Sequence, residues 1–389
     1  MIVQTKSTLM EKLKERSEMC IFRAAEWPRY SLITLSILAS MVLEPHAWGQ
    51  AFSYRGELTG MASQMEDQTG SDWLMRYLPE IKIQAAKEAE EDQWSWDANL
   101  AAYLYAYDSL SQGQDQDAEV FRAWVRLYDE TTEYRIGLQE LSFGPAILLR
   151  SLQWFDSKNP LDPTSFTKGV KGALVRFSTE NDSTYWVWAL YGNEDLTAAT
   201  RFVSDAEKPE SGGRAQFSSE IAEYAVTLHQ RQAVLSGQGS VDERRLGLDL
   251  KLDLAYNGLW LESMIIERAA DLPYPNQERY VTLGLDYTVD MTENGIVLTC
   301  ERNWGEAKTA ARDFTASTGN TALMASLSSG LLDSYVVTLM KSEIPESNLI
   351  RFDWQRTYDD FLWNLSLFQS QGGVAPAQFG LGLIVQYNH

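Results

Sequence analysis

Apolar and polar residues alternate along several segments of this chain. In residues 245–254 every second residue is leucine, and the positions between the leucines hold Arg, Gly, Asp and Lys. Residues 281–289 and 350–355 follow the same pattern. Successive side chains of an extended strand point to opposite faces, so a period of two predicts strands with one apolar and one polar face. No helical stripe of comparable length follows residue 50, and we therefore expect an all-β fold.

Two all-β architectures fit this pattern, a soluble sandwich and a membrane barrel with lipid outside and water inside. The expected strands run for about 9–11 residues, which is the length that a tilted transmembrane strand needs, whereas strands of soluble proteins usually have about 5–6. The chain is also 12% aromatic. Its Trp, Tyr and Phe residues lie near the ends of the apolar faces, as in the aromatic girdles of membrane barrels. These features favour the antiparallel transmembrane β-barrel.

Eighteen segments are expected to form strands, and sixteen is the alternative count because the first two are weak. The expected strands span residues 52–62, 75–85, 94–106, 118–128, 132–140, 168–178, 183–191, 213–219, 222–230, 244–254, 258–267, 279–289, 294–302, 320–329, 333–341, 348–356, 359–368 and 379–389. An even count places both chain ends on the same side of the barrel.

Short and long connections alternate between these segments. The short ones include residues 180–182 and the Asn257-Gly258 pair, a strong hairpin signal because both central turn residues need a positive φ. The long ones include residues 141–167, 192–212 and 303–319. Outer-membrane barrels combine short periplasmic turns with long extracellular loops, so the alternation predicts this architecture.

The first fifty residues have the pattern of a cleaved export signal. Basic residues precede the apolar run of residues 31–43, which is too short to span a bilayer as a helix. Ala47 and Gly49 then place small residues at the −3 and −1 positions of a cleavage site. We expect residues 1–49 to be a signal peptide and residues 50–389 to form the barrel. A buried helix of a soluble domain is the alternative interpretation of this segment.

Charge and cysteine content exclude several classes of function. The formal net charge is −21, with 33 Lys and Arg against 54 Asp and Glu. No nucleic-acid partner is expected, because phosphate contacts require an excess of Lys and Arg. Cys20 lies in the expected signal peptide, so Cys300 is left without an intrachain partner and no disulfide or cysteine metal site is expected. We expect Cys300 to fill an apolar position on a membrane-facing strand.

The last eleven residues, 379–389, resemble the terminal strand signal that the barrel-assembly machinery of the outer membrane recognises. Alternate residues from Leu381 to Tyr387 share one apolar face. Patterns of this kind usually end in Phe or Trp, and His389 departs from them.

A longer resemblance covers the chain from about Ala51 to its end. The motif Arg135-Ile-Gly-Leu-Gln139 leads into a long segment with Asn159-Pro-Leu-Asp-Pro163, and the apolar stretch of residues 169–176 follows. This order resembles the alginate-export-like and related barrels within the large family of porin-like outer-membrane barrels. The resemblance implies passive or facilitated transport of a polar solute across the outer membrane of a Gram-negative bacterium, and it specifies no substrate.

In a membrane barrel the polar strand faces line the lumen. In residues 119–127 this alternation places Phe121 on the lipid side and Arg122 and Arg126 on the lumen side. Arg135 and Arg176 fall on the lumen side of neighbouring strands. A column of guanidinium groups makes a positive wall in a water-filled pore. We therefore expect these four arginines to line the pore.

Residues 141–167 form the longest expected loop, and they include the apolar run Pro145–Leu149, which would be unusual in water. We expect this loop to fold inward and to place Asp156 and Asp162 opposite the arginine column, across a constriction. Opposed charges produce a transverse field that orients dipolar solutes. The alternative is that these charges only hydrate the lumen and pair with one another.

Three aromatic residues, Tyr103, Tyr105 and Trp124, also fall on the lumen face in this register. Aromatic rings in a polar channel can stack on the faces of sugars. The alternatives are that the rings fill the barrel wall, or that a slip of one residue turns them toward lipid.

Few features indicate an enzyme. After removal of the expected signal peptide the chain has two histidines, His229 and His389, so no histidine cluster can hold zinc, and no cofactor or metal is expected. A Ser–His hydrolase inside the barrel could use only His229, and the Gly-x-Ser-x-Gly motif of such enzymes is missing from the sequence. No phosphate-binding or dinucleotide-binding glycine motif occurs either.

The leading hypothesis is a porin-like channel for small polar solutes such as sugars or organic ions. The first alternative is a non-conducting outer-membrane barrel that acts as an adhesin, receptor or scaffold through its loops. The second is a secreted soluble β-domain that binds glycans. The expected partners are outer-membrane lipid and lipopolysaccharide, the barrel-assembly machinery and a polar solute, and assembly as a homotrimer is left open.

Overall fold

The computed structural model describes residues 50–66, 70–85, 94–110, 113–197, 200–271, 273–292, 294–372 and 378–389. These residues form eighteen strands. The strands are β1 (Gln50–Met65), β2 (Asp72–Ala85), β3 (Ser95–Ser109), β4 (Gly113–Tyr128), β5 (Thr132–Gln139), β6 (Val170–Ser178), β7 (Ser183–Leu190), β8 (Glu210–Ser218), β9 (Ala222–Leu235), β10 (Gly239–Leu254), β11 (Asn257–Arg268), β12 (Pro275–Val289), β13 (Ile296–Thr309), β14 (Arg312–Ser329), β15 (Asp333–Glu343), β16 (Glu346–Tyr358), β17 (Phe361–Gly372) and β18 (Gln378–Asn388). Within these ranges no helix is long and apolar enough to cross a membrane. The expected signal peptide, residues 1–49, lies outside the described residues.

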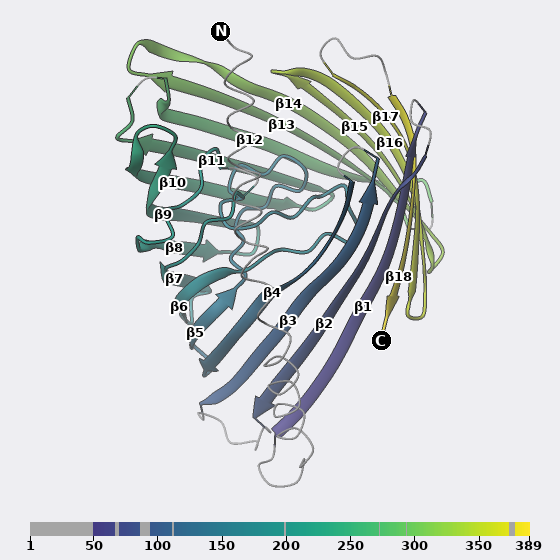
Figure 1. Cartoon of the computed structure of the whole chain (residues 1–389), viewed down its shortest axis with the longest axis horizontal. Helices are drawn as coiled ribbons and strands as arrows, with labels where there is room; N and C mark the ends of the chain where they lie inside the picture. The colour runs from purple at the N-terminus through teal and green to yellow at the C-terminus, as the bar shows by residue number, and fades with distance from the viewer. Residues whose placement is uncertain are drawn as a thin grey trace. The chain divides into compact units, whose positions relative to one another are not determined.

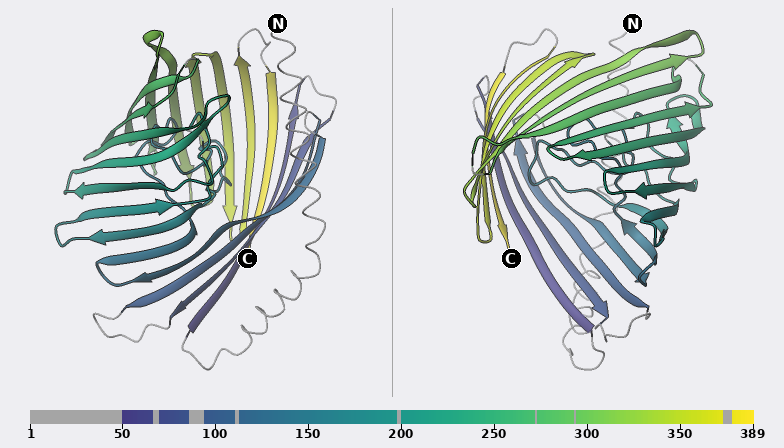
Figure 2. Two further views of the ribbon diagram at one scale, coloured as in Figure 1. Left: turned by 60° about the vertical axis from the view of Figure 1, so that its left-hand side comes forward. Right: turned by 180° about the vertical axis from the view of Figure 1, so that it is seen from behind.

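The strands form one closed antiparallel ring. Each strand pairs with its neighbours in the chain, and β1 pairs with β18 from Glu57 and Asn388 to Met65 and Gly380, which closes the ring. Figure 1 and Figure 2 show the strands following one another around this ring in chain order. The predicted all-β, antiparallel barrel is therefore confirmed, with eighteen strands.

The alternation of the sequence corresponds to the two faces of the ring. In β9 the outward Val226 and Leu228 are 39% and 57% exposed, whereas Thr227 and His229 between them are 1% and 3% exposed. Such a barrel has an apolar outside and a polar inside, as a wall between lipid and water requires. Cys300 follows this rule, because it alternates with the buried Thr299 and Glu301 on β13.

Aromatic side chains gather on the outer face near the end of the ring where the shorter turns lie. Tyr185, Phe217 and Tyr224 contact one another in sequence on β7, β8 and β9, with ring centroids 6.0 and 5.2 Å apart. Phe361 and Tyr387 form a similar pair on β17 and β18, at 4.8 Å. Aromatic rings at this level are typical of the interface between the apolar core of a membrane and water.

The eighteen expected segments coincide with the eighteen strands, but many strands are longer than expected. Residues 303–319, expected as a loop, belong mostly to β13 and β14, which are joined by a turn at residues 310–311. Beyond the apolar belt both faces of a strand can be polar, so the alternation disappears before the strand ends. Among the described connections, residues 140–169 and 191–209 are the long ones.

One turn differs from the expected hairpin signal. The turn between β10 and β11 is formed by Ala255 and Tyr256, with Ala255 at a φ of 53°. Asn257 pairs with Leu254 and Gly258 pairs with Asp253, so the Asn-Gly pair lies in the strand. The Gly258 amide donates a hydrogen bond of 2.8 Å to Asp286 on β12. The Asn-Gly pair therefore contributes to the contact between β11 and β12.

A β-bulge on β4 corrects the face assigned to Phe121. Ala101 pairs with Arg122 and Ala102 pairs with Val120, so Phe121 is an extra residue. The bulge turns both Phe121 and Arg122 to the inside, and Phe121 is 7% exposed. The expectation that Phe121 faces lipid was wrong, because strict alternation does not continue through a bulge.

The chain end takes part in closing the ring. The His389 amide donates to the Gly56 carbonyl at 2.9 Å, and the Gly56 amide donates to the His389 carbonyl at 2.8 Å. The His389 ring lies 5.9 Å from the Tyr77 ring, nearly parallel to it, and 5.7 Å from the Tyr54 ring. His389 thus occupies an aromatic position although it is neither Phe nor Trp.

Replacement of Gly137 by alanine is expected to weaken the pairing of β4 with β5. Gly137 has a φ of 126°, and a Cβ at this position would overlap the Ala123 backbone. We expect a lower unfolding temperature for Gly137→Ala, measured by the loss of heat-modifiable migration in electrophoresis.

The matched control is Gly60→Ala on β1, where the nearest atom to a new Cβ would be the Met75 sulfur at 3.4 Å. Equal unfolding temperatures for the two variants would contradict the assigned role of Gly137.

Candidate functional site

The loop of residues 140–169 folds into the barrel. Figure 1 and Figure 2 show the segment between β5 and β6 inside the ring of strands. Apolar residues of the loop and of the wall form one buried cluster. Its members are Leu141, Phe143, Leu152, Trp154 and Phe155 from the loop, Val170 and Leu174 from β6, Trp188 and Leu190 from β7, and Met264 and Ile266 from β11. The loop therefore packs on the inner wall and narrows the lumen.

Two buried glutamates of the wall hold the loop by its backbone. Glu301 on β13 accepts the amides of residues 147, 148 and 149 at 2.6, 2.9 and 2.5 Å. Glu262 on β11 accepts the amides of Ala146 and Leu152, both at 3.0 Å. Both glutamates are 0% exposed. A buried carboxylate needs several donors, and the loop backbone supplies them.

Small residues and an indole complete this attachment. The Trp260 Nε1 group donates to Glu301 at 3.0 Å, and Gly284 on the strand between them leaves space for the indole. In the loop, Gly144 has a φ of 89° and lies against the Glu262 carboxylate, where a Cβ would collide. The attachment thus depends on two glycines as well as two carboxylates.

Removal of the Glu301 carboxylate is expected to release the loop. Glu301→Ala leaves three loop amides and the Trp260 indole without their acceptor, at a cost of about 1–3 kcal/mol for each buried group left unpaired. We expect faster cleavage by trypsin after Arg150 or Lys158 of the loop.

The matched control is Glu306→Ala on the same strand, because Glu306 is exposed on the outer face. If trypsin cleaved Glu301→Ala no faster than the unmodified protein, this role of Glu301 would be contradicted.

Three of the four expected arginines meet at one buried carboxylate. Glu133 on β5 is 4% exposed and lies 3.6 Å from Arg126, 2.5 Å from Arg135 and 3.3 Å from Arg176. Arg126 is also paired with Asp97 on β3 at 2.5 Å. Three guanidinium groups thus share two carboxylates, and the cluster keeps one net positive charge. We call these five residues the arginine cluster.

Arg122 lies apart from the arginine cluster. It pairs with Glu140 at the beginning of the inward loop, and its side chain is 25% exposed. The three arginines of the arginine cluster show a similar degree of exposure, from 17% for Arg135 to 42% for Arg176. The four arginines therefore lie on the inner wall of β4, β5 and β6 with part of each side chain accessible.

Two tryptophans, Trp124 and Trp186, lie against the guanidinium groups of the arginine cluster. The Trp124 ring lies on the inner face, with the Arg135 guanidinium 4.9 Å and the Arg126 guanidinium 5.7 Å from its centroid. The Arg176 guanidinium lies 5.9 Å from the Trp186 ring. Contacts of this kind stabilise a cation over an aromatic ring. The Trp124 ring, one of the three rings expected to stack on sugars, is therefore in contact with two arginines.

Asp156 does not face the arginine cluster. It is 1% exposed and accepts hydrogen bonds from Ser142 at 2.7 Å, Arg150 at 3.0 Å and Gln153 at 2.6 Å. All three partners belong to the loop, so this carboxylate stabilises the fold of the loop itself. The expectation of a constriction between Asp156 and the arginines is corrected, because the loop brings its own arginine to Asp156.

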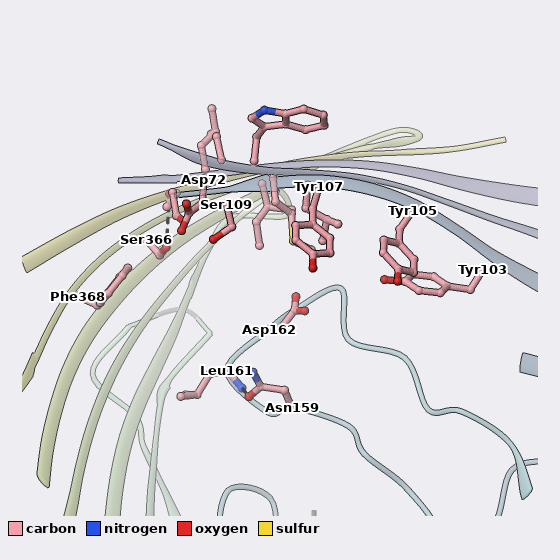
Figure 3. Close-up of a pocket in the computed structure, with 18 of the residues that line it drawn as sticks. Asp72, Tyr103, Tyr105, Tyr107, Ser109, Asn159, Leu161, Asp162, Ser366 and Phe368 are labelled. Atoms are coloured by element: carbon pink, nitrogen blue, oxygen red, sulfur yellow. Dashed lines mark hydrogen bonds between the residues drawn. The ribbon is translucent and has the colours of Figure 1, made fainter. Parts of the chain in front are cut away.

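Asp162 lies in a separate cavity with two of the expected aromatic residues. Figure 3 shows Tyr103, Tyr105 and Tyr107 projecting from β3 toward Asp162 and Asn159 of the loop. Asp162 also accepts the amide of Thr164 at 2.8 Å, which shapes the loop backbone. The tyrosines thus face the inside of the barrel, as the expected register requires, and Asp162 faces them instead of the arginine cluster.

A second charged network on β9 to β12 escaped the sequence analysis. Arg231, Arg245 and Arg268 surround Glu243, and Arg268 also contacts Glu278 at 2.5 Å. All five residues are at most 6% exposed. Their position on polar strand faces was visible in the sequence, but their pairing depends on the register between strands. The two loop-holding glutamates were missed because their partners are backbone amides of the loop, whose path the alternation does not predict.

His229 has partners that do not suit a hydrolase. Its Nε2 atom lies 3.0 Å from Glu210, and its Nδ1 atom accepts the Trp188 indole at 3.3 Å. Both ring nitrogens are thus engaged by groups other than a serine hydroxyl. The ring is buried among Trp154, Phe155 and Trp188, which agrees with a structural role.

The closed eighteen-stranded ring with an inward loop defines the fold of outer-membrane porins. No protein-family model matches the sequence, and no curated protein is significantly similar to it. Solved structures, however, share the fold along most of the chain. They include OccD3 (OpdP) of Pseudomonas aeruginosa, with 9% identity, a TM-score of 0.60 and coverage of 88% of this chain and 92% of that chain. OccAB4 of Acinetobacter baumannii has 7% identity, a TM-score of 0.58 and coverage of 89% and 100%.

A third structure, OpdQ of Pseudomonas aeruginosa, has 9% identity and a TM-score of 0.57, with 87% of this chain and 98% of that chain covered. At these identities the likeness concerns the fold alone. It supports the general porin-like barrel, and it does not confirm the narrower resemblance to alginate-export-like barrels.

Proposed function

We propose that this chain is a porin-like outer-membrane channel through which small polar solutes, sugars or organic ions, cross by passive or facilitated diffusion. The observation that carries the proposal is the loop of residues 140–169, which lies inside an eighteen-stranded ring with charged inner walls. Barrels of about 16–18 strands are wide enough to leave an aqueous channel. A loop held against one wall narrows such a channel and brings solutes close to charged side chains.

The charges along β3 and β4 support this role. On one side of the bulge, Tyr103, Tyr105 and Tyr107 pair with Glu119, Asp117 and Asp115 in the register of the two strands. On the other side lie Arg122 and the arginine cluster. The inner face therefore changes from acidic on one side of the bulge, along β3 and β4, to basic on the other side, from β4 to β6. A solute moving past it meets both signs of charge, and such a field favours polar and dipolar molecules over apolar ones.

The proposed channel also implies a location in the outer membrane and a set of partners there. The chain would be exported through the periplasm as a precursor with residues 1–49 removed, and folded into the outer membrane by the barrel-assembly machinery. Outer-membrane lipid and lipopolysaccharide would surround the apolar outer face. The likeness to porins, which are not enzymes, suggests a transport role without catalysis.

Conduction is expected in a planar bilayer. The detergent-folded protein should give stepwise current, and a salt gradient should report its ion preference. Arg176→Gln removes the most exposed guanidinium of the arginine cluster, at 42% exposure. Loss of one charge beside the ion path should lower the anion-to-cation permeability ratio by about threefold.

Arg279→Gln is the matched control, because Arg279 is exposed on the outer face of β12 and should leave the ratio unchanged. A folded barrel that inserts into the bilayer and never conducts would refute the channel and favour a binding or scaffold role. A conducting barrel whose ion preference is insensitive to Arg176→Gln would place the arginine cluster outside the path.

A further inference from the structure

A cavity of about 700 Å³ lies between the inward loop and the inner side of neighbouring strands, from β16 through β18 and β1 to β4. Figure 3 shows the tyrosines of β3 on one side, Asn159, Leu161 and Asp162 of the loop in the middle, and Phe368 and Ser366 of β17 on another side. Cavities that hold small molecules usually have about 300–1,000 Å³. The size of this one is therefore suited to a small ligand.

The aromatic wall of the cavity is a row of three tyrosines. Tyr103, Tyr105 and Tyr107 occupy alternate positions of β3, so their side chains share the inner face. The ring centroids are 4.9 Å apart for the first pair and 6.0 Å apart for the second, and the ring planes are tilted by 29° and 12°. All three rings are partly exposed. Phe166 packs behind Tyr103 at 4.9 Å and supports the end of the row.

Hydrogen-bonding groups surround this aromatic wall. Asp72, Asp117 and Asp162 line the cavity, and each uses its Oδ1 atom for a backbone amide, at 2.8 Å in every case. A carboxylate has a second oxygen that can accept a hydroxyl group. Ser63 and Asn159 add neutral donors and acceptors to the lining. The cavity thus offers both aromatic surface and closely spaced polar groups.

The formal charge of the cavity lining is negative. The basic lining residues are already engaged, because Lys168 is paired with Glu119 at 2.6 Å and Arg351 with Asp353 at 2.7 Å. Partial burial acts against the charged form of Lys168, but the ion pair with Glu119 outweighs it and raises the pKa of the amine. The lining therefore repels an anionic ligand and accepts a neutral one.

We propose that this cavity is a binding site for a neutral sugar, whose ring packs on the tyrosine row while its hydroxyl groups bond to the carboxylates and amides of the lining. The C–H groups of a sugar ring carry a small positive charge that suits the negative face of an aromatic ring. The hydroxyl groups of the sugar can form hydrogen bonds with both the neutral and the acidic groups of the lining, whereas a simple cation would pair with the acidic groups alone. The inference deepens the proposed channel function and relies on it for the route of the sugar.

Titration calorimetry of the detergent-folded chain tests the site without any need for conduction. The probes are maltose as the neutral sugar, glucuronate as the anionic sugar and cadaverine as a simple cation. We expect saturable binding of maltose and weaker binding of glucuronate. Tyr105→Ala should lower the affinity for maltose by about tenfold, because a stacked ring contact is lost.

Two variants control for effects on folding. Tyr105→Phe keeps the ring and should bind maltose nearly as well as the unmodified protein. Tyr287→Ala removes a tyrosine from the outer face, where the side chain is 44% exposed, and should leave maltose binding unchanged. Heat-modifiable migration of each variant shows whether the barrel is folded.

The outcomes separate the sugar site from the channel. Maltose binding that is lost in Tyr105→Ala and kept in Tyr105→Phe supports the site, whether or not the protein conducts. Absence of saturable maltose binding, equal binding by folded Tyr105→Ala, or binding of cadaverine in preference to maltose overturns it. If the barrel conducts but does not bind maltose, the channel proposal stands and the sugar site is refuted. If the barrel binds maltose but does not conduct, the sugar site stands and the channel proposal is refuted.

Discussion

The closed ring of backbone hydrogen bonds is the constraint on which the rest of this structure depends. A bilayer offers no water to an unpaired amide or carbonyl, so a sheet in a membrane cannot keep an open edge. The pairing of β1 with β18 removes both edges, and the chain end at His389 extends it by two further bonds to Gly56. Closure fixes the register of all eighteen strands, and the register determines which charged groups meet inside.

Buried charge inside the ring is organised by the loop as well as by ion pairs. Glu262 and Glu301 bind loop amides in place of basic side chains, whereas Glu133 and Glu243 are surrounded by arginines. Backbone amides are fixed in space by the chain, so they hold a segment at a defined place more firmly than long flexible side chains do. The inner wall therefore has one part that anchors the loop, a buried ion-pair network around Glu243, and a third part, the arginine cluster, that exposes charge to the lumen.

The fold was predictable from the sequence because membrane strands repeat one simple pattern. Each of the eighteen expected segments coincides with a strand, and the inward position of Tyr105 and Arg126 followed from alternation alone. The site was predictable only in part. Which carboxylate meets which arginine depends on register and on the path of the loop, and neither is encoded in the period of two. Asp156 illustrates this limit, since its partner Arg150 is only six residues away in the chain and yet reaches it only in the folded loop.

The bulge at Phe121 divides β4 into two halves, and the residues that face the lumen have odd numbers in one half and even numbers in the other. On one side odd-numbered residues such as Asp117 and Glu119 face the lumen, and on the other side even-numbered residues such as Arg126 do. Deletion of Phe121 would remove the bulge and leave the other residues of β4 on their present faces, because Val120 and Arg122 already pair with consecutive residues of β3. Deletion of a residue within either regular half would instead reverse the faces of the residues beyond it and could turn acidic side chains toward lipid. Variation in chain length should accordingly be tolerated at turns such as residues 310–311 and at the bulge itself, and resisted within the regular halves of β4.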